Sequence, residues 1–272
     1  MLCKARRNYS ASNKFIMQHL KVGILQFNQA WENKSLNYKN IRKLIDPHSE
    51  IDLLLLPEMF HTGFTMNVDH AESMKNSNGI HFLKTISTEL NCAVYTSLII
   101  EDKGNYYNRG VFIEPNEVMH LYDKRKTFGL AGENKDFSSG TTRSIINYKD
   151  WKLNLQICYD LRFPELTANQ LGKGGKPEFD VILYIANWPE KRIAHWNTLL
   201  KARAIENQSY VVGCNRVGLD FNDINYIGGS CVINALGEVM TKESDKEKFI
   251  VYEIQKSNLN TTRSQLPFLK DR

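Results

Sequence analysis

The sequence has no apolar run near the ~18 residues that a membrane-spanning helix needs, so we expect no membrane partner. Cysteines are also few, because only Cys3, Cys92, Cys158, Cys214 and Cys231 occur and they form no C-x-x-C pair. This spacing predicts neither a disulfide framework nor a thiolate metal site, and it favours a reducing compartment, the cytoplasm. The 35 basic and 30 acidic residues leave too small a surplus to indicate nucleic-acid binding.

Glycine-rich nucleotide-binding motifs are missing as well. The pairs Gly174-Gly175 and Gly228-Gly229 fit neither a P-loop nor a G-x-G-x-x-G fingerprint, and we expect no cofactor. With 42% hydrophobic residues in 272, the chain has enough apolar material for one large domain or two small ones. No linker, repeat or low-complexity run divides it, so we expect one domain over residues 20–272, including the C-terminal tail.

The N-terminus differs in character from the rest of the chain. Residues 1–21 contain five basic side chains and no acidic one, but they lack the apolar core of a secretory signal. They fit either a transit peptide or an upstream start before Met17, because periodic sequence begins just after that residue. We therefore expect residues 1–19 to form a disordered extension.

Strand and helix patterns alternate over most of the remaining length. Expected strands cover residues 21–28, 51–56, 92–100, 106–114, 118–122, 144–148, 151–157, 179–186, 210–217, 229–234 and 249–254. Expected helices cover residues 31–46, 79–90, 164–171 and 190–208, whereas residues 123–140 and the tail from 260 read as irregular. This alternation predicts a layered α/β domain with a mixed sheet.

The stretch around Cys158 carries the strongest sign of chemistry. Leu153, Leu155 and Ile157 alternate with polar residues as in a strand, and Pro164 suits the first turn of a helix. Cys158 thus lies where a strand breaks into a turn, and there the pKa of a thiol can fall to roughly 3.5–7.5. The alternative is a buried core cysteine, which is common in proteins.

Three reactive side chains follow the ends of expected strands. Glu58 is two residues past an apolar run, Lys124 follows the end of the strand 118–122, and Cys158 directly follows Ile157. Strand ends are where α/β sheets hold ligands. A carboxylate, an ammonium and a thiol are the set that acyl transfer through a thioester requires. Taken singly, the glutamate and the lysine fit solvated surface charges better, because exposed Lys and Glu at strand ends are usually solvated.

The same positions resemble the three signature blocks of the nitrilase (carbon–nitrogen hydrolase) superfamily. The blocks are Leu56–Phe60, Tyr122–Arg125 and Gln156–Glu165, in the order Glu, Lys, Cys. Similar stretches continue at 186–189, 200–207 and 213–218. Together with residues 63–66 and the tail 266–271, they are most similar to the bacterial omega-amidase branch.

This resemblance implies a fold and a set of catalytic roles. The implied fold is a four-layer αββα sandwich with two mixed β-sheets, paired into homodimers. Glu58 would be general base and acid, Cys158 the nucleophile, and Lys124 the oxyanion stabiliser, assisted by the backbone N–H of Tyr159. A second glutamate of the lysine loop maps onto Glu133. The chain departs from the family at Lys126-Thr127-Phe128, where His-Leu-Phe is common, which puts the shape of this loop in doubt.

The implied reaction is hydrolysis of the terminal amide of small 2-oxo dicarboxylic acid monoamides, such as 2-oxoglutaramate and 2-oxosuccinamate, to the acid and ammonia through a cysteine thioester. Arg162 is a candidate for the substrate carboxylate, with a structural pair to Glu165 as the alternative. Phe60 and Trp188 are candidates for the pocket wall, with core packing as the alternative.

Three other functions stay open. The nearest is another carbon–nitrogen hydrolase, namely an N-carbamoyl hydrolase, an aliphatic amidase or a nitrilase. A Cys–His hydrolase is the second, with His195 as the histidine to test. The third is a binding protein that kept the fold, which the intact set of Glu58, Lys124 and Cys158 argues against.

Overall fold

The computed structural model of the chain describes residues 19–272. The expected N-terminal extension lies outside this range except for His19, which begins β1 (His19–Gln26). Two mixed sheets form the centre of the molecule. The first has the order β14 (Lys248–Gln255), β1, β2 (Leu53–Leu55), β4 (Ala93–Asp102), β5 (Asn105–Ile113) and β6 (Met119–Asp123), with β3 (Glu72–Ser73) beside β4. The second has the order β13 (Cys231–Ile233), β10 (Tyr210–Asn215), β9 (Val181–Ala186), β8 (Trp151–Ile157) and β7 (Ile145–Tyr148).

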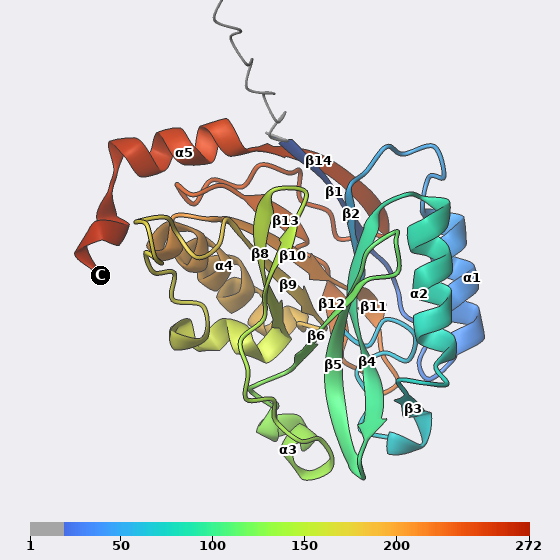
Figure 1. Cartoon of the computed structure of the whole chain (residues 1–272). Coiled ribbons are helices and arrows are strands. Elements are labelled where there is room, and N and C mark those ends of the chain that lie inside the picture. The colour runs from blue at the N-terminus through green and yellow to red at the C-terminus, as the bar shows by residue number, and fades with distance from the viewer. Residues whose placement is uncertain (1–18) are drawn as a thin grey trace, which may run out of the picture.

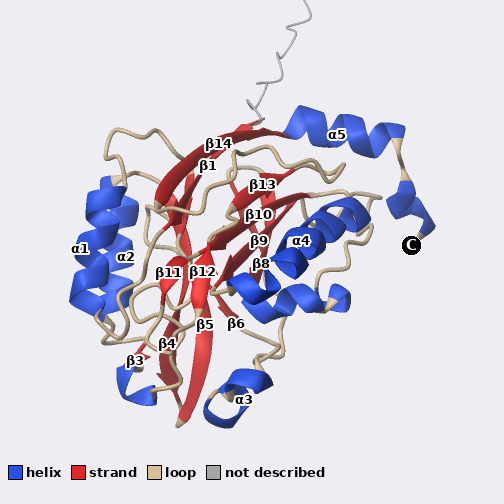
Figure 2. Cartoon of the chain, turned by 180° about the vertical axis from the view of Figure 1, so that it is seen from behind, coloured by secondary structure: helices blue, strands red, loops and turns tan. Residues whose placement is uncertain are grey.

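Helices cover the outer face of each sheet (Figures 1 and 2). The helices α1 (Lys34–Leu44) and α2 (Asn78–Glu89) lie on the first sheet, and α4 (Ile193–Asn207) lies on the second. The side chains of Asn33 and Ser77 accept hydrogen bonds from the free N–H groups of the first turns of α1 and α2. The predicted four-layer αββα arrangement is therefore confirmed. No helix within residues 19–272 combines the length and apolarity needed to cross a bilayer.

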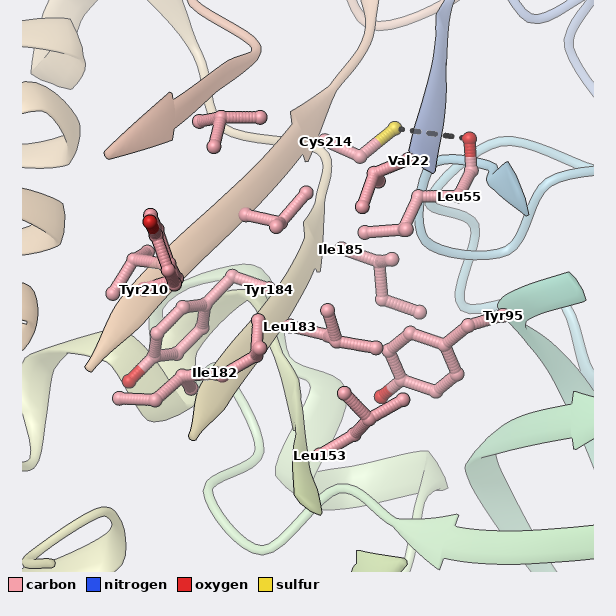
Figure 3. Close-up of a cluster of buried hydrophobic side chains, with 14 of the residues drawn as sticks. Val22, Leu55, Tyr95, Leu153, Ile182, Leu183, Tyr184, Ile185, Tyr210 and Cys214 are labelled. Carbon is pink, nitrogen blue, oxygen red and sulfur yellow. Dashed lines mark hydrogen bonds between the residues drawn. The ribbon is translucent and has the colours of Figure 1, made fainter. Parts of the chain in front are cut away.

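Burial on both faces explains the continuous apolar strands. In β2, Leu53 and Leu55 point between the sheets, whereas Leu54 points under α1 and α2. Figure 3 shows the layer between the sheets, where Tyr95 and Leu55 face Leu183 and Cys214. The Cys214 thiol donates to the carbonyl of Leu55 over 3.7 Å, and full burial of one such leucine contributes about 1.5–3 kcal/mol. The two sheets are thus fixed against each other.

Three expected elements differ from the structure. Residues 164–171 form no α-helix: a 3₁₀ turn at Pro164–Leu166 is followed by irregular chain, and another 3₁₀ turn, Cys158–Arg162, precedes it. The tail from residue 260 is partly helical, since α5 (Lys256–Gln265) follows β14 directly. The loop 123–140 contains the single turn α3 (Glu133–Asp136). A small two-stranded sheet, β11 (Val217–Leu219) with β12 (Asn225–Ile227), was not expected as a separate unit.

Candidate active site

The ends of several parallel strands bring the candidate residues together. β2 and β4 are parallel, and β6 runs in the same direction because β5 is antiparallel to both β4 and β6. Glu58 and Lys124 therefore leave the first sheet at one edge. Cys158 leaves the second sheet at the end of β8, beside the end of the parallel β9. The two edges meet in one site, as expected for ligand sites at strand ends.

A buried ionic cluster forms the centre of this site. The Lys124 Nζ donates to Glu58 Oε1 over 2.8 Å and to Glu133 Oε2 over 2.8 Å. Glu58 and Glu133 are fully buried and Lys124 is 1% exposed, so water competes little with these bonds. Glu133 also accepts from the N–H of Phe128 over 2.5 Å. The structure thus brings three of the four predicted catalytic side chains into direct contact.

Cys158 joins this cluster at the floor of a cleft. Its side chain is 8% exposed, and its Sγ lies 3.9 Å from the carbonyl oxygen of Asn187, to which the thiol donates. Burial and then the charge of Glu58 raise the pKa of Cys158 well above its usual range, and a hydrogen bond to Glu58 acts in the same direction. The shift is opposite to the lowering that a turn at a strand end can produce, and it favours the neutral thiol.

For Lys124, neighbouring charges favour the ionised form, whereas for Cys158 burial and the Glu58 charge favour the neutral form. Burial favours its neutral form, but the charges of Glu133 and Glu58 outweigh burial and raise the pKa of Lys124. The ammonium is thus held in its charged form beside a neutral thiol. Such a charge can stabilise an oxyanion that develops near the sulfur.

The turn that carries the nucleophile has an unusual backbone. Cys158 has a φ of +44°, in the left-handed region that non-glycine residues seldom adopt. The N–H of Tyr159, at the second position of the 3₁₀ turn, has no acceptor within that turn. Asp160 fixes this geometry, because its carboxylate accepts from the N–H of Ile157 over 3.0 Å and from the N–H of Lys126 over 2.9 Å.

Two asparagines of the site were missed by sequence reasoning. Asn108 Nδ2 donates to Glu58 Oε1 over 2.8 Å and to Glu133 Oε1 over 3.0 Å. The N–H of Asn187 donates to Glu58 Oε2 over 3.0 Å. Asn187 follows β9, so its place at a strand end was a usable signal, whereas Asn108 lies inside β5 and carried none.

A cleft of about 460 Å³ opens above Cys158, within the usual range for small-molecule sites. Arg162 and Trp188, two of the predicted substrate residues, line it. Arg162 donates to Nδ1 of His195 over 3.1 Å rather than pairing with Glu165. Phe128 also lines the cleft, so the departure at Lys126-Thr127-Phe128 contributes to the wall.

Phe60 does not line the cleft. It is fully buried in the core under α1 and α2, with its ring 4.8 Å from the ring of His61 and 6.0 Å from that of Phe82. The prediction that Phe60 walls the pocket is therefore wrong, because its side chain points away from the strand-end site. Phe64, four residues later, lines the cleft and lies with its ring centre 5.1 Å from Lys124 Nζ.

Histidines and metal ligands contribute little to this centre. The His61 ring contacts Tyr38 over 2.9 Å on the helical side of the first sheet, and His195 contacts Arg162. The described part of the chain contains no group of three or more His, Cys, Asp or Glu side chains that could hold a metal ion. Among the described carboxylates, Glu58 is hydrogen-bonded to the Cys158 thiol.

Comparisons with known proteins all find carbon–nitrogen hydrolases or amidases. The sequence model of the family described as Carbon-nitrogen hydrolase matches residues 21–264. The chain is 35% identical to "Omega-amidase YafV" of Yersinia enterocolitica over 94% of this chain and 97% of that protein. It is 28% identical to "2-oxoglutaramate amidase" of Bacillus subtilis over 92% of this chain and 96% of that protein. The crystal structure of XC1258 from Xanthomonas campestris, a CN-hydrolase superfamily protein, superimposes with a TM-score of 0.91 at 33% identity, covering 94% of this chain and 98% of that one.

Proposed function

Because the chain belongs to the carbon–nitrogen hydrolase family, within the omega-amidase branch of the nitrilase superfamily, we propose that it hydrolyses the terminal amide of small 2-oxo dicarboxylic acid monoamides. It is an amidohydrolase, and 2-oxoglutaramate and 2-oxosuccinamate are the proposed substrates. The observation that carries this proposal is the buried contact of Lys124 with Glu58, beside the thiol of Cys158 at the cleft floor. The relative from Bacillus subtilis named 2-oxoglutaramate amidase supports the substrate class.

The acylation step follows from the resting protonation states. Glu58 takes the proton of the Cys158 thiol while the sulfur attacks the amide carbon. The oxyanion that forms is stabilised by the Lys124 ammonium and the N–H of Tyr159, and one such donor is typically worth about 3–4 kcal/mol. Glu58 then gives its proton to the amide nitrogen, the C–N bond breaks, and ammonia leaves a thioester on Cys158.

Deacylation uses the same groups. Glu58 takes a proton from a water molecule, the water oxygen attacks the thioester carbon, and the C–S bond breaks as the sulfur regains a proton. Both oxygens of Glu133 are already occupied by Lys124, Asn108 and the N–H of Phe128. Glu58 also accepts hydrogen bonds on both oxygens, but it is the glutamate that is hydrogen-bonded to the Cys158 thiol. We therefore assign Glu58 to activating the water and Glu133 to holding the ammonium in place.

The surface and the cysteines support two further proposals. Ile205, Leu236 and Met240 expose 53%, 50% and 38% of their surface, and Gly237, which follows Leu236, lies against the Ile205 side chain. We propose that this apolar patch is covered in a homodimer. The four described cysteines are free thiols, which fits the proposed cytoplasmic location.

An ammonia-release panel tests the proposed reaction. We expect a kcat/KM for 2-oxoglutaramate at least about tenfold above those for glutamine, N-carbamoyl compounds and nitriles. A preference for an N-carbamoyl compound, a simple aliphatic amide or a nitrile would instead identify the corresponding alternative hydrolase. His195→Ala should retain turnover, whereas loss of turnover in this variant would support a Cys–His hydrolase.

A further inference from the structure

Two arginines of the cleft have no role in the chemistry described above. We propose that Arg192, together with Arg162, binds the carboxylate and the 2-oxo oxygen of the substrate, and that this pair excludes amides with a 2-ammonium group. The inference rests on the proposed function, because it concerns the end of the substrate remote from the scissile amide. Arg192 stands just before α4, at the end of a 3₁₀ turn (Glu190–Arg192).

Arg162 and Arg192 belong to a closed circuit of contacts around the cleft, in which each residue touches the next and the last touches the first. Arg162 lies over the Trp188 ring at 4.8 Å and over the Tyr159 ring at 6.0 Å. The Tyr159 ring is 4.9 Å from the Phe128 ring, and Arg192 lies over Phe128 at 5.4 Å. Trp188 Nε1 closes the circuit by donating to the Arg192 carbonyl over 2.8 Å. All five residues line the cleft that Cys158 enters.

The positive charges of Arg162 and Arg192 are not neutralised by an ion pair within the described part of the chain. Among residues 19–272, neither Arg162 nor Arg192 forms an ion pair, and both side chains are only partly exposed. The one acidic side chain that lines the cleft, Asp220, is occupied by its own loop. Its carboxylate accepts from the hydroxyl of Tyr226 over 3.0 Å and from the N–H groups of Asn222 and Ile224. Arg162 donates to His195, but no described carboxylate neutralises either guanidinium, so an anion is the ligand that the two arginines favour.

The chemistry of a 2-oxo acid matches two guanidiniums. One planar fork binds a carboxylate through two parallel hydrogen bonds, and a second guanidinium can donate to the adjacent oxo oxygen. Stacking on aromatic rings holds each fork in a fixed plane and lowers the entropy lost on binding. A 2-ammonium group, as in glutamine, would place a like charge at the same point and is repelled.

Four five-carbon amides show whether Arg192 recognises the carboxylate and 2-oxo group of the substrate or only supports the structure of the cleft. They are 2-oxoglutaramate, glutaramate without a 2-substituent, L-glutamine, and pentanamide without a carboxylate. We expect Arg192→Gln to lower kcat/KM for 2-oxoglutaramate about 10- to 100-fold, mainly through KM, because a charged hydrogen bond is lost. Turnover of pentanamide should stay within about twofold, and the preference for 2-oxoglutaramate over glutamine should narrow at least about tenfold.

Lys191→Gln is the matched control, because it removes the same charge from the neighbouring, exposed position outside the cleft. We expect it to leave all four kcat/KM values within about twofold of wild type. The subsite would be overturned if Arg192→Gln lost as much kcat/KM on pentanamide as on 2-oxoglutaramate. It would also be overturned if Lys191→Gln lost as much kcat/KM on 2-oxoglutaramate as Arg192→Gln does. No loss at all would overturn it as well.

Different results would contradict the proposed function and the proposed arginine subsite. If wild-type protein prefers N-carbamoyl compounds, the proposed function is wrong, and the same two variants are then compared on N-carbamoyl-β-alanine and its uncharged analogue propylurea. A selective loss on the charged member supports the arginine subsite even in that case. Arg192→Lys, which keeps the charge without the fork, should show an intermediate loss on the charged substrate.

Discussion

At the scale of single residues, burial determines how the thiol is activated. Cys158 lies beside one ammonium and two carboxylates, and burial together with the Glu58 charge raises its pKa. A preformed thiolate is therefore disfavoured. Proton transfer to Glu58 has to accompany the attack, so groups that position this carboxylate control the rate.

Asn108 is such a positioning residue. Its amide bridges Glu58 and Glu133, and its replacement by alanine removes both hydrogen bonds while leaving the charges in place. We expect Asn108→Ala to lower kcat about 10- to 100-fold with little change in KM, measured by steady-state ammonia release. Asn105→Ala, in the exposed start of the same strand, is the control and should behave as wild type. A rise in KM at constant kcat would show that Asn108 serves binding instead.

Asp160 links the pH dependence of stability to the nucleophile turn. Burial raises the pKa of this carboxyl group from its ordinary 3.8 to about 6 in the folded protein. Its favourable contribution to the free energy of unfolding is thus complete below pH 3.8 and is lost as pH rises through about 6. The loss is about 3 kcal/mol in total.

Chemical denaturation between pH 5 and pH 7 checks this sign. The free energy of unfolding of wild type relative to Asp160→Asn should fall as pH rises across this range, because asparagine does not titrate. A difference that stays constant or rises with pH would contradict the raised pKa of Asp160. The variant should also have lower turnover, since it cannot accept hydrogen bonds from Ile157, Lys126 and Tyr122 together.

At the scale of elements, the lysine loop depends on one close backbone approach. The N–H of Gly140 donates to the Lys124 carbonyl over 2.9 Å, and a Cβ at Gly140 would lie 2.1 Å from the carbonyl oxygen of Asp123. Only glycine fits there without moving the chain that carries Lys124. The 15-residue helix α4 supports the facing turn, because Arg203 Nη2 donates to the Leu161 carbonyl over 2.7 Å.

Gly140→Ala should therefore reduce both activity and stability. We expect kcat to fall about 100-fold because the Lys124 ammonium is displaced, a loss comparable to that of one oxyanion donor, and Tm to fall as well because the added Cβ meets backbone atoms. Gly172→Ala is the matched control, since its added Cβ would meet the nearest atom at an ordinary 3.7 Å. Full activity in Gly140→Ala would show that the loop tolerates the shift and that the position of Lys124 is not critical.

The strand ends were predictable from sequence, whereas the segment after the nucleophile was not. Apolar runs before Glu58 and Cys158 specify buried strands whatever surrounds them, so these residues could be placed at strand ends, although the two strands belong to different sheets. Residues 164–171 have a helix-like start at Pro164, but side-chain bonds of Asn169 to the carbonyls of Phe179 and Asn207 hold the backbone open. Such long-range bonds have no local signal.

The substrate end of the cleft was harder to predict for a related reason. Phe60 and Phe64 both follow the same strand, and sequence does not show which ring turns into the core and which into the cleft. Arg192 and Phe128 lie far apart in the chain and meet only through the packing of the two strand-end loops. Glu58, Lys124 and Cys158 could be predicted because each follows a strand and because the motifs around them resemble the signature blocks of the family.

At the scale of the whole molecule, the two sheets hold the halves of the site at a fixed separation, and the outer face of α4 stays available for association. We expect the purified protein to have the mass of a homodimer in light scattering coupled to size-exclusion chromatography. Ile205→Glu should shift it to monomer, because a charge in the apolar patch is costly to bury, and Val118→Glu, at an exposed apolar position elsewhere, should not. Monomer in wild type would contradict the proposed dimer.

The central claim is that Cys158 carries the acyl group during amide hydrolysis. Acid quenching of the enzyme with 2-oxoglutaramate within the first turnover, followed by peptide mass spectrometry, measures this directly. The account predicts an adduct of substrate minus ammonia on the peptide that contains Cys158, and none in Cys158→Ala, which should fold normally and release no ammonia. An adduct on another residue, or full ammonia release by Cys158→Ala, would contradict the account.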